Sequence, residues 1–197
     1  MIFLRAFLIG ISIAAPVGPI GVLCIRRTLS NGKLAGFLSG MGAATADMVY
    51  GAIAAFGLTL ITTALIENAF WLKLLGGLFL LYLGIKTFFE KPADQAALAK
   101  QGGYFSMYFS TFFLTITNPI TILSFAAIFA GTMIGQNMGS PFLIVAGVFT
   151  GSASWWLALS FGVGLMRDKL NQNHMVWINR FSGATIFVFG IFALLNL

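Results

Sequence analysis

The chain has 197 residues, of which 59% are hydrophobic and only 8% are charged. Soluble domains carry about a quarter charged residues, so this composition excludes an ordinary soluble domain and predicts an integral membrane protein. The formal net charge of +6 comes from basic residues scattered over short segments, which argues against a nucleic-acid partner. We therefore expect one compact domain, residues 1–197, surrounded by membrane lipid.

The apolar residues fall into six runs, separated by polar or charged breaks. The runs cover residues 2–25, 34–65, 70–89, 104–134, 142–166 and 175–197. A membrane-spanning helix needs about 20 apolar residues, and none of the runs alternates polar and apolar residues as the strands of a membrane β-barrel do. The pattern predicts an all-α protein with six transmembrane helices, the first of them an uncleaved helix rather than a removed leader.

The position of Lys and Arg in the short loops predicts the orientation, because these residues favour the cytoplasmic side. Counting alternate loops places nine basic residues on one side and two on the other. The first side holds Arg26, Arg27, Lys33, Lys86, Lys91, Lys100, Arg167, Lys169 and Arg180, and the second holds Arg5 and Lys73. We expect both termini outside and the loop 90–103 in the cytoplasm.

Asp47 is the only acidic residue inside the run 34–65. An ionised carboxylate at membrane depth costs several kcal/mol on most estimates, so such residues usually face a polar cavity and bind or relay something. The alternative is a structural carboxylate that holds two helices together through nearby polar groups. The functional interpretation makes Asp47 the first candidate for binding a substrate or a proton.

The two halves of the chain are similar to each other. Runs three and six match at an offset of 106 residues and runs two and five at an offset of 107. The matched pairs are Trp71 with Trp177, Gly77 with Gly183, Gly84 with Gly190, Ile85 with Ile191, Gly40 with Gly147, Ala46 with Ala153 and Gly57 with Gly164. Three helices per half predict two inverted repeats, about 1–90 and 104–197, and inverted repeats favour a transporter.

Runs one and four are interrupted at comparable places. Run one contains Ala-Pro-Val-Gly-Pro at 15–19 and run four contains Thr-Asn-Pro-Ile-Thr at 117–121. Proline removes a backbone donor and breaks a helix, and matched breaks in two halves indicate a binding site near the membrane midplane. Simple packing kinks are the alternative. The candidate site residues are Pro16, Gly18, Pro19, Asn118, Pro119 and Thr121, together with Asp47 and Ser154, its equivalent in the other half.

The segment APVGPIGVLCIRRTLSNGKLAGFLSGMGAATAD, with its proline-glycine break, basic stretch and glycine-rich second helix, resembles the lysine exporter (LysE) family of bacterial amino-acid exporters. The NPIT segment is similar to that family's Asn-Pro motif, and the resemblance in length and order covers nearly the whole chain. It implies a secondary transporter in the bacterial inner membrane that exports amino acids or related small metabolites, driven by the proton gradient. It is compatible with a homo-oligomer.

Three other functions are possible alternatives: a membrane scaffold, a cation exporter and an enzyme. The residue content argues against the last two. A membrane scaffold or assembly subunit without transport would use Asp47 as a helix contact. A cation exporter is weakened by the single intramembrane carboxylate, since hard cations prefer several oxygen ligands. An enzyme is weakened further, because there is no second intramembrane acid and because Cys24 and His174 are each the only residue of their type. We expect neither a metal nor a cofactor.

Overall fold

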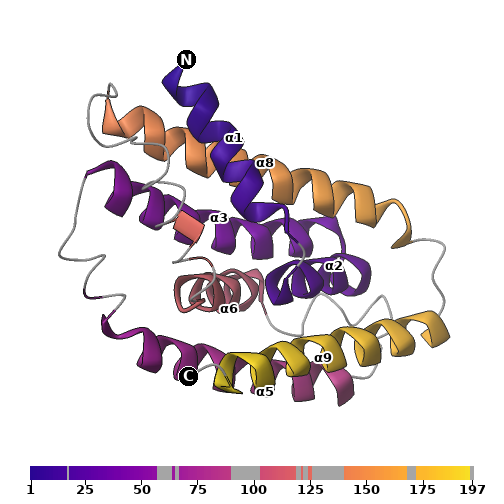
Figure 1. The fold of residues 1–197 in the computed structure, drawn as a ribbon. Coiled ribbons are helices and arrows are strands. Elements are labelled where there is room, and N and C mark those ends of the chain that lie inside the picture. Colours follow the sequence, from indigo (N-terminus) through magenta and orange to yellow (C-terminus); the bar gives the residue numbers. More distant parts are fainter. Residues whose placement is uncertain are drawn as a thin grey trace.

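The computed structural model describes residues 1–16, 18–56, 64, 67–89, 103–118, 121, 124–125, 140–167 and 172–195. These residues form helices throughout, which confirms the all-α prediction (Figure 1). The helices are α1 (Ile2–Ala14), α2 (Pro19–Asn31), α3 (Lys33–Ala55), α5 (Ala69–Phe89), α6 (Tyr104–Ile116), α8 (Pro141–Gly164) and α9 (Gln172–Leu195). Most of the predicted loop 90–103 and the ends of runs two and four lie outside the described residues.

Helices long and apolar enough to cross a membrane occur in the described part of the chain. Three qualify singly, at Phe70–Phe89, Pro141–Gly164 and Asn173–Leu195, and the bent pair α1 and α2 would add a fourth. Helix α6 is apolar but has only 13 residues. The structure thus shows a helical protein with membrane-spanning helices, while the number of six spans stays a prediction.

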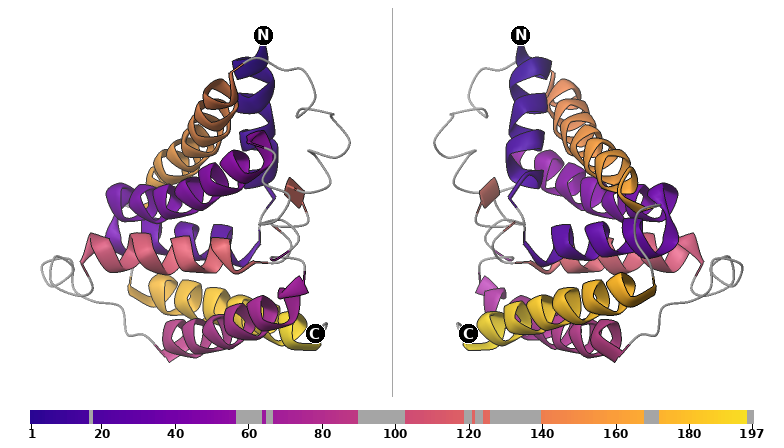
Figure 2. Two further views of the ribbon diagram at one scale, coloured as in Figure 1. Left: turned by 90° about the vertical axis from the view of Figure 1, so that its left-hand side faces the viewer. Right: turned by 90° about the vertical axis from the view of Figure 1, so that its right-hand side faces the viewer.

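Helix α3 lies in the middle of the molecule and packs against α8 on one side and α6 on the other (Figures 1 and 2). Glycines allow close approaches between α3 and α6 and between α8 and α1. A Cβ atom on Gly42 of α3 would lie 2.2 Å from the Tyr108 carbonyl oxygen of α6, and one on Gly151 of α8 would lie 2.1 Å from the Phe7 carbonyl oxygen of α1. Small residues therefore bring the helix backbones together, as is usual in membrane proteins.

Helices α5 and α9 form an antiparallel pair along one side of the molecule (Figures 1 and 2). Their contact also depends on glycine. A Cβ on Gly84 would lie 2.7 Å from the Phe187 backbone nitrogen, and one on Gly183 would lie 2.7 Å from the Gly84 carbonyl oxygen. Helix α5 packs chiefly against α9, and α9 also contacts α2.

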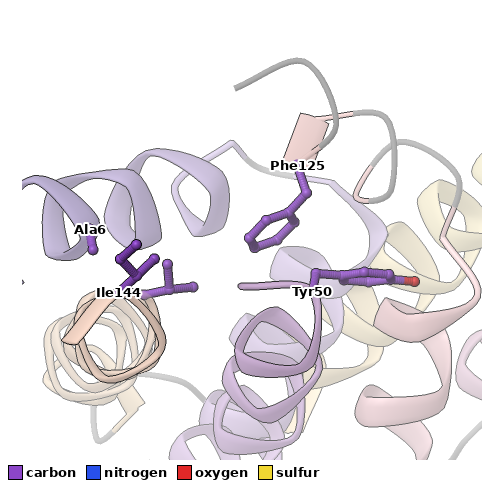
Figure 3. Close-up of a cluster of buried hydrophobic side chains, with 5 residues drawn as sticks. Ala6, Tyr50, Phe125 and Ile144 are labelled. Carbon is purple, nitrogen blue, oxygen red and sulfur yellow. The ribbon is translucent and has the colours of Figure 1, made fainter. Parts of the chain in front are cut away.

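A buried hydrophobic cluster joins α1, α3 and α8 (Figure 3). Figure 3 shows Ala6 of α1 beside Ile144 of α8, with the Phe125 ring between them and Tyr50 of α3 in this view. The ring of Tyr50 lies 5.5 Å from that of Phe125, centroid to centroid, and its hydroxyl donates a hydrogen bond to the Ile116 carbonyl at the end of α6. This cluster holds the end of α6 beside the middle of α3.

The interruption predicted in the first run is a sharp bend between two helices. Helix α1 ends at Ala14, α2 begins at Pro19, and the two helices differ in direction by 82°. Proline at the first turn of α2 needs no donor there, because the first amides of a helix lack intrahelical partners. Gly18 precedes it in an extended conformation as the N-cap.

Helix α2 continues past the predicted end of the run at residue 25, and this corrects the placement of Arg26 and Arg27 in a loop. Both residues lie within α2 and are buried, with 6% and 8% of their surfaces exposed. The turn to α3 consists of Gly32, whose φ of 99° suits glycine. Seven of the nine basic residues counted on the cytoplasmic side therefore remain outside this helix.

Hydrogen bonds donated by both guanidinium groups satisfy their buried charges. The Arg27 guanidinium donates to the Ser39 hydroxyl (3.0 Å) of α3 and, on α6, to the Met107 carbonyl (2.8 Å) and the Ser110 (2.7 Å) and Thr111 (2.9 Å) hydroxyls. Arg26 Nε donates to Asn179 Oδ1 of α9 at 3.0 Å. A buried charge persists only where such partners satisfy it, so α2 is fixed to three neighbouring helices by its two arginines.

Candidate functional site

A cavity of about 280 Å³ lies at the bend between α1 and α2. Its wall is built from both halves of the chain: the end of α1, the first turn of α2, the middle of α3, the residues around and after the end of α6, and α8 and α9. Six of the eight predicted site residues line it, namely Pro16, Gly18, Pro19, Asp47, Asn118 and Thr121. The structure thus brings the two interrupted segments and the intramembrane carboxylate together.

Asp47 lies in the middle of α3 and is buried, with 3% of its surface exposed. The Ser152 hydroxyl of α8 donates a hydrogen bond of 2.7 Å to its carboxylate. Ala43, Ala44 and Ala46 surround it on α3 and are themselves buried, so the backbone of α8 can approach closely. The carboxylate is consequently held between two helices while it still borders the cavity.

The structure places Ser154 elsewhere. This residue is exposed on α8, its hydroxyl donates to the Thr150 carbonyl one turn earlier at 2.6 Å, and it does not line the cavity. Ser154, which the sequence suggested for the site as the repeat equivalent of Asp47, therefore lies outside this cavity, and Ser152 contacts Asp47 instead. The contact partner of Asp47 on α8 thus lies two residues before its repeat equivalent.

The first turn of α2 forms one wall of the cavity, through Gly18, Pro19, Ile20 and Gly21. No side chain caps this helix end. The amide groups of a first helical turn have no intrahelical acceptor, and the helix dipole adds a partial positive charge there. The cavity therefore borders a carboxylate on α3 and the positive end of a helix on α2.

The second half of the chain contributes Thr115, Asn118, Thr121 and Ser124 to the wall, as well as Trp156 of α8 and Phe189 of α9. Pro119, the remaining predicted site residue, lies outside the described residues. Ser152 and Trp156 were not identified from the sequence. Their spacing of four residues on one face of α8 was the available indication, since residues four apart on a helix are neighbours.

The arrangement is suited to binding a small polar molecule. Among the residues that the structure describes, no group of three His, Cys, Asp or Glu side chains could hold a metal ion. The cavity is lined by one carboxylate, the hydroxyl side chains of Thr115, Thr121 and Ser124, the amide side chain of Asn118 and the first turn of α2, in a mostly apolar surrounding. Such a wall fits a small molecule that carries both a positive and a negative group.

A polar cavity at a broken helix is a feature of many membrane transporters. The family comparison agrees, since residues 11–197 match the family described as LysE type translocator. The chain belongs to this family, which confirms the resemblance found in its motifs. A transporter family is consistent with the expectation that the protein is not an enzyme.

Relatives over the full length have related descriptions. The chain is 29% identical to the "Putative amino acid efflux protein YcgF" of Bacillus subtilis, over 97% of this chain and 94% of that protein. It is 28% identical to the threonine efflux protein of Escherichia coli, over 100% of this chain and 98% of that protein. No solved structure matches the chain significantly.

Proposed function

We propose that this protein is a secondary transporter of the bacterial inner membrane that exports amino acids or related small metabolites in exchange for protons. The observation that carries the proposal is the cavity in which Asp47 and the break between α1 and α2 meet. The names of the two relatives, an amino acid efflux protein and a threonine efflux protein, support the substrate class. The cavity volume of about 280 Å³ suits a small metabolite, because larger ligands occupy pockets of roughly 300–1,000 Å³.

In this proposal Asp47 binds the substrate's ammonium group or the coupling proton, but not both at once. A carboxylate that has taken up a proton no longer attracts an ammonium group. Competition for one carboxylate therefore links release of the amino acid to uptake of a proton, which is the requirement for exchange. Ser152 holds the carboxylate in place through its hydrogen bond in the present structure.

The helix contacts support the predicted inverted repeats within a single domain. At the offset of 106 residues, Gly77 corresponds to Gly183 and Gly84 to Gly190. A Cβ on Gly190 would lie 3.1 Å from the Gly77 carbonyl oxygen, and one on Gly183 would lie 2.7 Å from that of Gly84. Exchanging the halves turns each of these residue pairs, Gly77 with Gly190 and Gly84 with Gly183, into the other, as expected for a two-fold relation between repeats.

The test is efflux of a panel of amino acids and dipeptides from cells that overproduce the protein, compared with cells that carry an empty vector. We expect at least one amino acid to be exported faster, and Asp47→Asn to abolish this export although the variant still inserts in the membrane. The asparagine keeps the size and the hydrogen bond to Ser152 but cannot ionise. Export at the wild-type rate by the Asn variant over a range of pH would contradict the role of Asp47. A scaffold without transport would export nothing in the panel.

A further inference from the structure

Tyr50 of α3 contacts the chain on both sides of the interruption at 117–121. Its hydroxyl donates a hydrogen bond to the carbonyl of Ile116, the residue at which α6 ends. Its ring lies 5.5 Å from the ring of Phe125, centroid to centroid, a separation typical of attractive aromatic pairs. One buried side chain therefore holds the chain before and after the interruption (Figure 3).

The polar groups that the second half of the chain contributes to the cavity lie at these contacts or between them in the sequence. Thr115 lines the cavity one residue before the hydrogen bond of Tyr50. Asn118, Thr121 and Ser124, here called the polar set, also line the cavity. All three fall between the two residues that Tyr50 contacts, so the contacts of Tyr50 enclose the polar set in the sequence.

Tyr50 does not itself line the cavity, and only 3% of its surface is exposed. It follows Asp47 by three positions on α3, and residues three apart on a helix are neighbours. The helix that carries the cavity's carboxylate thus also carries the side chain that contacts both ends of the segment with the polar set. Tyr50 is placed to fix the distance between the two.

The end of α6 gives the hydrogen bond a definite role. The last four carbonyl groups of a helix have no intrahelical donor, and Ile116 is the last residue of α6. A buried acceptor without a partner is unfavourable. The Tyr50 hydroxyl therefore favours the position in which this end of α6 lies against α3, directly before the polar set.

We propose that Tyr50 is a positioning residue of the substrate site, which holds the polar set at a fixed distance from Asp47 so that both contact one substrate molecule. This inference rests on the proposed function and extends it from Asp47 to the part of the wall that the second half contributes. Tyr50 does not touch the substrate. Its hydroxyl acts through the polar set, so its loss should weaken binding of the substrate without blocking its passage.

Two tyrosines allow a matched comparison of transport. Tyr50→Phe keeps the ring but removes the donor. Tyr108→Phe also removes a hydroxyl that joins α6 to α3, since Tyr108 donates to the Thr45 hydroxyl at 2.8 Å, but neither Tyr108 nor Thr45 lines the cavity. One ordinary hydrogen bond corresponds to about a fivefold change in an equilibrium constant.

We therefore expect Tyr50→Phe to raise the KM for amino-acid export about fivefold, with the maximal rate per inserted molecule changed by less than about twofold, as for a loss of uniform binding. Tyr108→Phe should leave both quantities at the values of the unmodified protein. A hydrogen bond that only stabilised the fold would lower the amount of inserted protein or its thermal midpoint and leave the KM unchanged.

A second measurement follows the polar set without transport. Thr121 is buried, with 8% of its surface exposed, so a cysteine at this position reacts only after a local opening. We expect a small thiol reagent in detergent to label Thr121→Cys about fivefold faster when Tyr50→Phe is also present, and at an unchanged rate with Tyr108→Phe. The unmodified chain is the blank, because its cysteine, Cys24, is fully buried.

The proposal requires both changes. A Tyr50→Phe variant with an unchanged KM, or with labelling of Thr121→Cys no faster than in the Tyr108→Phe variant, overturns the positioning role and leaves the exporter intact. If the unmodified protein exports no amino acid, the proposed function and the substrate role of Tyr50 fail together.

Discussion

At the scale of single residues, the hydrogen bond from Ser152 to Asp47 connects the middles of α8 and α3. A hydrogen bond to a charged group is worth about 1.5–3 kcal/mol. The bond therefore orients the carboxylate toward the cavity strongly enough to influence what the carboxylate binds. Its loss should affect transport more than folding, since alanine at 152 would fit between the same helices.

The prediction compares two serines two positions apart on α8. Ser152→Ala should lower the rate of amino-acid export about tenfold, because a change of 1.4 kcal/mol is a factor of ten. Ser154→Ala should export normally, since Ser154 is exposed and bonded to its own helix. Export rates normalised to the amount of protein in the membrane provide the measurement. Equal losses in the two variants would show that the Ser152 contact has no special role.

The sequence alone identified Asp47, because an acidic residue within an apolar run stands out by its charge. It could not identify Ser152, because an uncharged serine does not stand out in a membrane helix. The alignment of the two repeats pointed to Ser154 instead. Arg26 and Arg27 were placed in a loop because charge favours water. Their oxygen partners come from three different helices, and no pattern along the chain reveals such distant contacts.

At the scale of helices, the break before α2 depends on proline and glycine, and its bounds followed from the sequence. Runs three, five and six were also placed to within a few residues of α5, α8 and α9. The abrupt change of direction and the extension of α2 to Asn31 were not predicted. Both depend on what surrounds α2 in space rather than on its own residues.

Pro19→Ala should reduce export while the protein still folds, because the new amide and the relaxed backbone allow α1 and α2 to straighten over the cavity. The matched control is Pro141→Ala, since Pro141 also begins a helix but does not line the cavity. Export and thermal unfolding in detergent would be measured for both variants. Normal export by a folded Pro19 variant would make this proline a packing kink, and we expect Pro119→Ala to behave like Pro19→Ala.

The glycines between α5 and α9 give a prediction about stability. Gly84→Ala should lower the free energy of unfolding by about 1–3 kcal/mol, the usual cost of overpacking, because its Cβ would lie 2.7 Å from the Phe187 backbone. Gly162→Ala is the control, since no atom lies within 4 Å of a Cβ there, and alanine in a helix is more favourable than glycine. Thermal unfolding in detergent should show a lower midpoint for the first variant only.

At the scale of the whole molecule, the orientation in the membrane can be tested with matched positions. Asn68 precedes α5 and Asn173 lies in the first turn of α9, and both are exposed. With both termini outside, Asn68→Cys should react with an impermeant thiol reagent added to intact cells, and Asn173→Cys should react only after the cells are opened. The unmodified chain is the blank, because its one cysteine, Cys24, is fully buried. The reverse labelling pattern would invert the topology.

Contacts among described residues support the grouping of basic residues at one end of the molecule. The Arg167 guanidinium donates to the Leu29 carbonyl at 3.3 Å, and a Cβ on Gly164 would lie 2.3 Å from the Lys33 side chain. The end of α8 therefore lies beside the turn between α2 and α3. The sequence-based orientation puts these two segments on the same side of the membrane, because it counts alternate loops together.

The neighbouring positions of Arg26 and Arg27 have a mechanical consequence. Successive residues on a helix point about 100° apart, so the two guanidinium groups reach in different directions: Arg26 to α9, which pairs with α5, and Arg27 to α3 and α6. Helix α2 thus connects the α5 and α9 pair to α3 and α6, beside the buried cluster through which α5 and α9 also contact α6. A movement of α9 relative to α3 would therefore act on α2 through its two arginines, and the first turn of this same helix forms a wall of the cavity.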